Sequence, residues 1–103
     1  MSRFKRAPYR NRRILDAAKG ETCVRCGAND ETVVAAHYSG MGAHRLGKGM
    51  GQKADDHCVA WLCIACHQEM DSYSEGNGDA RAAEFLMLIL ETQRRLLDRG
   101  ILK

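Results

Sequence analysis

Several features that direct proteins to a membrane or to the secretory pathway are missing from this sequence. Its 103 residues contain no apolar run long enough to cross a bilayer. Proline and aromatic residues are also scarce, at 1 residue and 6% of the chain. No apolar leader opens the chain, so we expect a protein of a reducing cytosol with no membrane partner. A chain this short folds as one domain and buries about 60 to 65% of its unfolded surface, so a bound metal would add stability that a small core lacks.

Cysteine, in contrast, is well represented and regularly spaced. Four of the 5 cysteines form two Cys-x-x-Cys pairs, Cys23 with Cys26 and Cys63 with Cys66. Four thiolates at this spacing are typical of a tetrahedral structural zinc site that ties two distant parts of the chain together. Two disulfides are the alternative, but they would leave Cys58 unpaired and are disfavoured in a reducing compartment. We expect Cys58 to be a core residue of a buried strand.

Positive charge is concentrated at the amino-terminal end of the chain. Six basic residues precede the first acidic residue, Asp16, whereas the rest of the chain holds 10 basic and 13 acidic residues. We call these six residues the basic arm: Arg3, Lys5, Arg6, Arg10, Arg12 and Arg13. Clustered cations neutralise nucleic-acid phosphates, and a solvated tail is the alternative. We therefore expect DNA as the partner, with RNA also open.

The hydrophobic pattern predicts a small α+β fold. We expect a short helix over 10–19, strands over 32–38 and 57–62, and a helix that starts at the second cysteine pair. Residues 39–53 hold five glycines among several cations, which indicates either a solvated loop or a phosphate-binding loop with Arg45, Lys48 and Lys53 as contacts. Three regions follow within one domain: the arm and short helix at 1–19, a zinc-bound core at 20–78 and a final helix at 79–103.

The final helix is expected to be long and to pack on the core. Apolar residues recur at helical spacing from Ala82 to Leu97, and Gly100 provides a stop. Between Phe85 and Leu90 the helix is apolar on every side. This turn is therefore either buried all round by the small domain or in contact with a second subunit in a homodimer.

A histidine and an aspartate follow the second cysteine pair at a spacing of one helical turn. His67 and Asp71 are four residues apart, so they share one face of a helix. An imidazole and a carboxylate placed in this way can bind a divalent ion and leave positions open for a substrate. An ordinary solvated helix face is the alternative.

The order of these motifs resembles that of the HNH, or ββα-metal, endonucleases. The chain is more closely similar to the small nucleases of lambdoid phages and prophages typified by YbcO. The shared order is Cys-x-x-Cys, Ala-His at a strand end, a glycine-rich loop, Lys-x-x-Asp and Cys-His-x-Glu-x-Asp, over about residues 20–71. The resemblance implies a zinc-stapled ββα-metal core, treble-clef-like, in a metal-dependent endonuclease that hydrolyses DNA in the bacterial host cytosol. A zinc-organised nucleic-acid-binding or scaffold protein without cleavage is the alternative.

The resemblance also assigns roles to individual residues. His37 matches the general base, and histidine suits that task because it exchanges protons near neutral pH. His67 and Asp71 match ligands of a catalytic ion, which would be Mg²⁺, Mn²⁺ or Zn²⁺. Asp56 matches the aspartate of the Lys-x-x-Asp motif, and we expect it to be either a third ligand or an orienting partner.

The sequence departs from the HNH pattern at two places. In many HNH enzymes the residue before the base is a ligand of the catalytic ion, whereas this chain has Ala36, which cannot bind a metal. Cys58 lies near the position where these enzymes have an asparagine. Two further residues are expected to be accessories of the site, namely His44 and Glu69.

Overall fold

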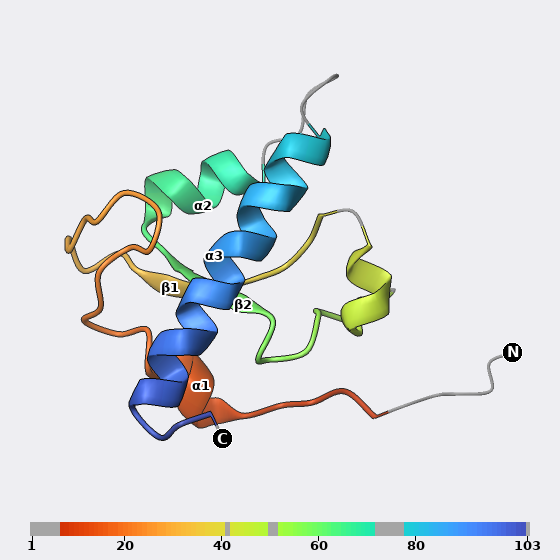
Figure 1. Ribbon diagram of the computed structural model, residues 1–103, viewed down its shortest axis with the longest axis horizontal. Coiled ribbons are helices and arrows are strands. Elements are labelled where there is room, and N and C mark those ends of the chain that lie inside the picture. Colours follow the sequence, from red (N-terminus) through yellow and green to blue (C-terminus); the bar gives the residue numbers. More distant parts are fainter. Residues whose placement is uncertain (1–6, 41, 50–51, 72–77, 103) are drawn as a thin grey trace, which may run out of the picture.

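The chain folds into a small α+β structure that ends in one long helix (Figure 1). A computed structural model describes residues 7–40, 42–49, 52–71 and 78–102. The elements follow in the order α1 (Arg12–Asp16), β1 (Val34–His37), the short 3-10 helix η1 (Ala43–Leu46), β2 (Val59–Leu62), α2 (Ile64–Met70) and α3 (Gly78–Asp98). The expected α+β class and the long carboxyl-terminal helix are confirmed.

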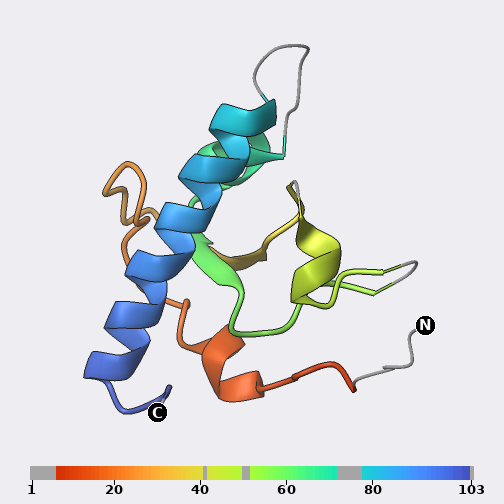
Figure 2. The same cartoon turned by 45° about the vertical axis from the view of Figure 1, so that its right-hand side comes forward.

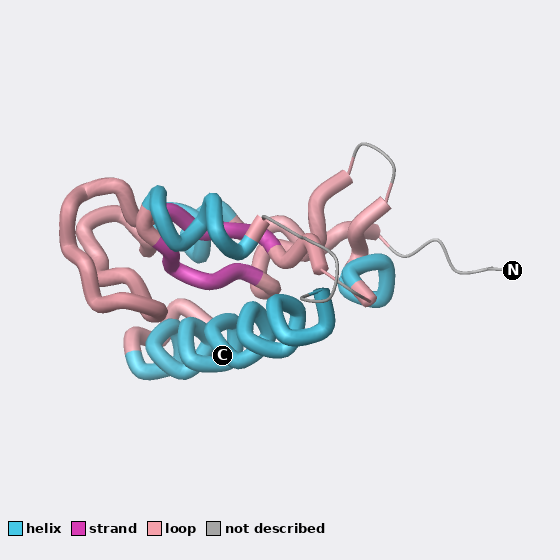
Figure 3. Tube along the Cα trace, turned by 90° about the horizontal axis from the view of Figure 1, so that it is seen from above, coloured by secondary structure: helices cyan, strands magenta, loops and turns pink. Residues whose placement is uncertain are grey.

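Two short antiparallel strands form the centre of the fold. Their register pairs Val34 with Leu62 and His37 with Val59. All four residues of β2 are buried, and α3 runs along one side of the sheet (Figure 3). The backbone N–H of Trp61 donates to Thr92 Oγ1 at 3.2 Å, so a side chain of α3 is bonded directly to the middle of β2.

The core is built from large side chains that β2, α2 and α3 bury together. Tyr38 and Phe85 meet edge to face with ring centroids 5.2 Å apart, an arrangement that aromatic pairs favour. The outer face of α3 is different, because four apolar residues there are 38 to 64% exposed: Leu86, Met87, Leu90 and Leu97. Burial all round is therefore wrong for this helix, and the homodimer through it stays a prediction.

The amino-terminal segment is docked on the protein from Tyr9 onward. Tyr9 exchanges two hydrogen bonds with the loop before β2: its N–H donates to Asp55 Oδ1 at 3.1 Å, and its carbonyl accepts from the N–H of Asp56 at 2.9 Å. Figure 2 shows this segment below the loop that enters β2. Because Asn11 is extended and caps the helix, α1 starts at Arg12 and not at residue 10 as expected.

Within the described residues, no helix is both long enough and apolar enough to cross a membrane.

Candidate functional site

The two Cys-x-x-Cys pairs come together in one cluster. The sulfur atoms of Cys23, Cys26, Cys63 and Cys66 all lie within 4.8 Å of one another, and those of Cys26 and Cys63 are 3.7 Å apart. A tetrahedral zinc ion with Zn–S bonds of about 2.3 Å requires sulfur atoms about 3.8 Å apart. The four cysteines of the cluster form no disulfide. The cluster therefore fits a structural metal such as zinc, and the two-disulfide alternative is wrong.

Local structure explains how the two turns present their sulfur atoms. The turn at 23–27 closes with a bond from Gly27 N–H to the carbonyl of Cys23 at 2.9 Å, and Gly27 has φ +81°, which favours glycine. The second pair lies where β2 ends and α2 begins, so Cys66 is in the first turn of the helix. Cys58 is buried outside the cluster, as expected.

The thiols of the cluster hold their protons with different strengths. Burial raises the pKa of Cys23, but bonds from backbone N–H groups outweigh burial and lower that pKa to about 7. In Cys66 burial dominates and raises the pKa to about 12, against the lowering effect of a bond from Arg25. Four neighbouring sulfur atoms cannot all be negative without a cation, and metal binding would release the protons that remain.

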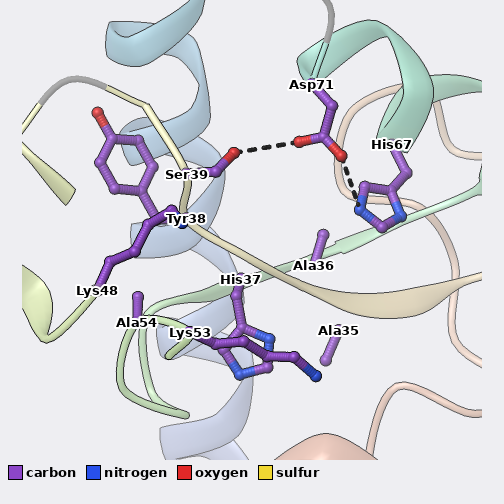
Figure 4. Close-up of a pocket in the computed structure, with 10 residues that line it drawn as sticks. All are labelled: Ala35, Ala36, His37, Tyr38, Ser39, Lys48, Lys53, Ala54, His67 and Asp71. Atoms are coloured by element: carbon purple, nitrogen blue, oxygen red, sulfur yellow. Dashed lines mark hydrogen bonds and ion pairs between the residues drawn. The ribbon is translucent and has the colours of Figure 1, made fainter. Parts of the chain in front are cut away.

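The second part of the site is a cleft at the end of β1. Its volume is about 280 Å³, and α2, β1 and the loop before β2 contribute to its walls. Figure 4 shows the side chains around it. The cleft brings together the expected base, the two expected ligands and two expected phosphate contacts, which are His37, His67, Asp71, Lys48 and Lys53.

His67 and Asp71 lie in contact with each other on one face of α2. His67 Nε2 and Asp71 Oδ2 are 3.3 Å apart. Two ligand atoms that each bind one ion at about 2.1 Å stand about 3.0 to 3.4 Å apart. The other oxygen of Asp71 accepts a hydrogen bond from Ser39 Oγ at 3.1 Å, which fixes the carboxylate. This spacing is compatible with two ligands of one divalent ion, and it is also the spacing of a direct contact between the two side chains.

His37, on β1, lies on the opposite side of that strand from His67 and Asp71. Figure 4 shows Ala36 on the side of His67 and Asp71, and His37 on the other side, as strand alternation requires. A third ligand would come most directly from position 36, where alanine has no donor atom. Among the described residues, only the cysteine cluster brings together three or more potential ligands.

Asp56 lies beside His37. Asp56 Oδ1 is 2.9 Å from His37 Nε2, and Oδ2 accepts the backbone N–H of Asn11 at 2.7 Å. Burial raises the pKa of Asp56, but the bond from His37, the bond from Asn11 and the charge of Arg10 outweigh burial and lower the pKa below its usual range. Both oxygens are bonded away from His67 and Asp71. Of the two roles expected for Asp56, its position thus favours the orienting partner over the third ligand.

The structure changes the expectation for the basic arm. Arg10 is held by the protein: its guanidinium donates to the carbonyls of Ala54 at 2.8 Å and Lys53 at 3.1 Å, and to Asp56 Oδ1 at 3.2 Å. Arg10 is therefore bound to the surface of the folded domain and is not part of a free tail. Arg12 and Arg13 are exposed on α1, Arg45 is exposed on η1, and three members of the arm lie outside the described residues: Arg3, Lys5 and Arg6.

Glu69 has a structural position that the sequence did not indicate. It accepts hydrogen bonds from Arg25 at 2.8 and 3.2 Å and from Arg81 at 3.1 Å, and Arg25 also donates to Glu84 at 2.7 Å. These bonds link the first cysteine turn to α2 and α3, so the position of Glu69 does not favour an accessory role. His44 is exposed on η1 and does not line the cleft.

Three site contacts were missed by sequence reasoning. Arg10 and Asn11 both bond to Asp56, and Ser39 bonds to Asp71. Only Ser39 has a sequence signal, because it follows His37 by two residues near the same strand end.

Comparison with known proteins assigns the family. A family model described as "Putative nuclease YbcO" matches residues 12–100. The chain belongs to the YbcO family. A solved structure described as "a putative bacteriophage protein" from Escherichia coli str. K-12 substr. MG1655 is 30% identical, with a TM-score of 0.56, and the match covers 84% of this chain and 98% of that one. Among curated proteins no match was found. The YbcO resemblance is confirmed, and it connects the chain with nucleases and bacteriophage.

Proposed function

We propose that the chain is a metal-dependent HNH-type endonuclease that hydrolyses phosphodiester bonds in DNA. The observation that carries this proposal is the single cleft lined by His37, His67, Asp71 and two lysines. Hydrolysis of a phosphodiester needs a base for water, positive charge at the phosphate and stabilisation of the leaving oxygen. The cleft offers a candidate group for each need, and membership of the YbcO family supports the same reaction class.

His37 would act as the general base, with Asp56 as its positioning residue. Asp56 is a carboxylate at neutral pH because its pKa is lowered, so the proton between the two groups is assigned to His37 Nε2. The other ring nitrogen, Nδ1, is then able to accept a proton from water. After this transfer the imidazolium is stabilised by the adjacent carboxylate, as in other histidine–aspartate pairs.

His67 and Asp71 would hold the catalytic ion, which when bound would supply positive charge to the phosphate and the leaving 3′ oxygen. Ser39 keeps the Asp71 carboxylate in place through its hydrogen bond. Lys48 and Lys53 line the same cleft, where their ammonium groups can bind phosphate oxygens. His37 lies on the other side of β1 from His67 and Asp71, and all three residues line the same cleft.

Position 36 favours a second candidate function, a zinc-organised nucleic-acid-binding or scaffold protein without cleavage. Alanine leaves the ion with His67 and Asp71 as protein ligands, and Asp56 is bonded to His37. A two-ligand site binds a divalent ion more weakly than a three-ligand site. The cysteine cluster and the basic residues serve both functions equally well.

A cleavage assay distinguishes the two functions. Purified protein is tested on supercoiled, branched and single-stranded DNA with Mg²⁺, Mn²⁺ or Zn²⁺. We expect cleavage by the parent protein, and a rate about 10² to 10⁴ lower in His37→Ala, because general-base catalysis contributes about this much.

The matched control is His44→Ala, which removes an exposed histidine outside the cleft and should cut like the parent. DNA affinity and zinc content should stay unchanged in both variants. Failure of the parent to cut any substrate with any ion would leave the binding-only function in its place.

A further inference from the structure

A second cleft adjoins the first one, and three of its lining residues have no role in the chemistry proposed above: Arg10, Leu15 and Gln52. Its volume is about 300 Å³. It shares His37 and Lys53 with the first cleft. The residues that line it are Arg10, Leu15, His37, Gln52, Lys53 and Asp56.

The polar groups of this second cleft suit an anion. Three hydrogen bonds to the loop before β2 fix the Arg10 guanidinium, yet its side chain remains 41% exposed. Lys53 and Gln52 are exposed beside it and can donate hydrogen bonds. A fixed guanidinium binds phosphate well because its planar donors are already oriented.

The carboxylate of Asp56 does not remove this preference. Its oxygens already accept hydrogen bonds from Arg10 and from the backbone N–H of Asn11, and Oδ1 is 2.9 Å from His37 Nε2. The side chain of Asp56 is also only 4% exposed. Its negative charge is therefore directed into the protein, whereas Arg10 and Lys53 are accessible from the cleft.

We propose that the second cleft binds the phosphate that adjoins the cleaved phosphate in the same nucleic-acid strand, through Arg10, Lys53 and Gln52. This inference rests on the proposed function, since it takes the first cleft as the place of the cleaved phosphate. Consecutive phosphates of a strand are separated by one sugar, and the two clefts share the residues that lie between them. The nucleic-acid strand thus passes over His37 with one phosphate in each cleft.

The test uses a thymidine trinucleotide, which has two internal phosphates, and records NMR spectra of the full chain without a divalent ion. Signals of Leu15 and Gln52 should shift together with those of Ser39 and Asp71. Gln52→Glu adds a negative charge to the second cleft alone and should weaken trinucleotide binding about threefold to tenfold.

Asn29→Asp is the matched control, because it adds the same charge at an exposed position outside both clefts and should change binding less than twofold. Equal weakening by the two variants, or shifts confined to the first cleft, would overturn the proposal. Inorganic phosphate at the same phosphate concentration should shift Leu15 and Gln52 less than the trinucleotide does. Equal shifts would show a simple phosphate site and would also overturn the proposal.

Absence of nuclease activity and absence of the second phosphate site give different results in these measurements. Binding is read without metal and without cleavage, so a protein that never cuts DNA can still show the second cleft occupied. Conversely, a protein that cuts DNA but shows no shift at Leu15 and Gln52 retains the nuclease function and loses this subsite.

Discussion

At the scale of single residues, the contact between His37 and Asp56 is the central feature. The sequence predicts both residues through the motifs that contain them, but not their contact. The prediction placed residues 57–62 in a strand, whereas β2 begins only at Val59 and the N–H of Cys58 donates to the carbonyl of Asp55 at 2.9 Å. This turn directs Asp56 toward His37, and only tertiary structure determines that direction.

Asp56→Asn tests this contact, because it keeps the shape of the side chain and removes the charge. We expect cleavage to slow by up to about 10⁴-fold, because an amide in place of the carboxylate favours the wrong tautomer of a general-base histidine. At neutral pH the free energy of unfolding should fall by about 1 to 3 kcal/mol, since the hydrogen bonds to Arg10 and Asn11 lose their charged acceptor.

The pH dependence of that difference has a defined sign. The pKa of Asp56 is lowered in the folded protein, so its stabilisation is fully present above the unfolded value of about 3.9 and is lost as the pH falls below it. Urea unfolding of parent and variant should differ at neutral pH and converge below about pH 4. A gap that persists in acid would contradict the role given to this carboxylate.

At the scale of elements, local pattern predicted the long helix well and the short elements less well. The final helix was expected to begin at residue 79 and to stop at Gly100, and α3 is observed at Gly78–Asp98. The prediction succeeds because the apolar spacing is repeated over many turns. α1 was expected at 10–19 and spans only Arg12–Asp16. The chain before α1 bonds to residues 53–56 instead, and no local signal encodes that pairing.

The cysteine cluster joins the turn at 23–27 to the junction of β2 and α2, so metal removal should unfold the domain. We expect one zinc per chain by metal analysis in the parent and in Cys58→Ala, whose sulfur lies outside the cluster. Cys63→Ser should lose the zinc and the cooperative unfolding transition, as small metal-dependent domains do. A folded, zinc-free parent protein would exclude the structural role of the metal.

At the scale of the whole molecule, the candidate site is assembled from four segments that are distant in sequence. The segment before α1, the end of β1, the loop before β2 and the helix α2 all contribute side chains to the two clefts. Motif order predicted which residues are chemically competent. Motif order could not predict that β1 lies between His37 and the pair His67 and Asp71. It also could not predict that Arg10, from the amino-terminal segment, lines the second cleft.

Chemical rescue of His37→Ala tests the central claim most directly, because the claim is that one imidazole activates water in this cleft. Single-turnover DNA cleavage is measured for the parent and for His37→Ala, with and without added imidazole. We predict that imidazole speeds the variant about tenfold or more and leaves the parent unchanged, since free imidazole can enter the space left by the side chain and accept the proton. A variant that cuts as fast as the parent, or that imidazole does not accelerate, would contradict the assignment of His37 as the base.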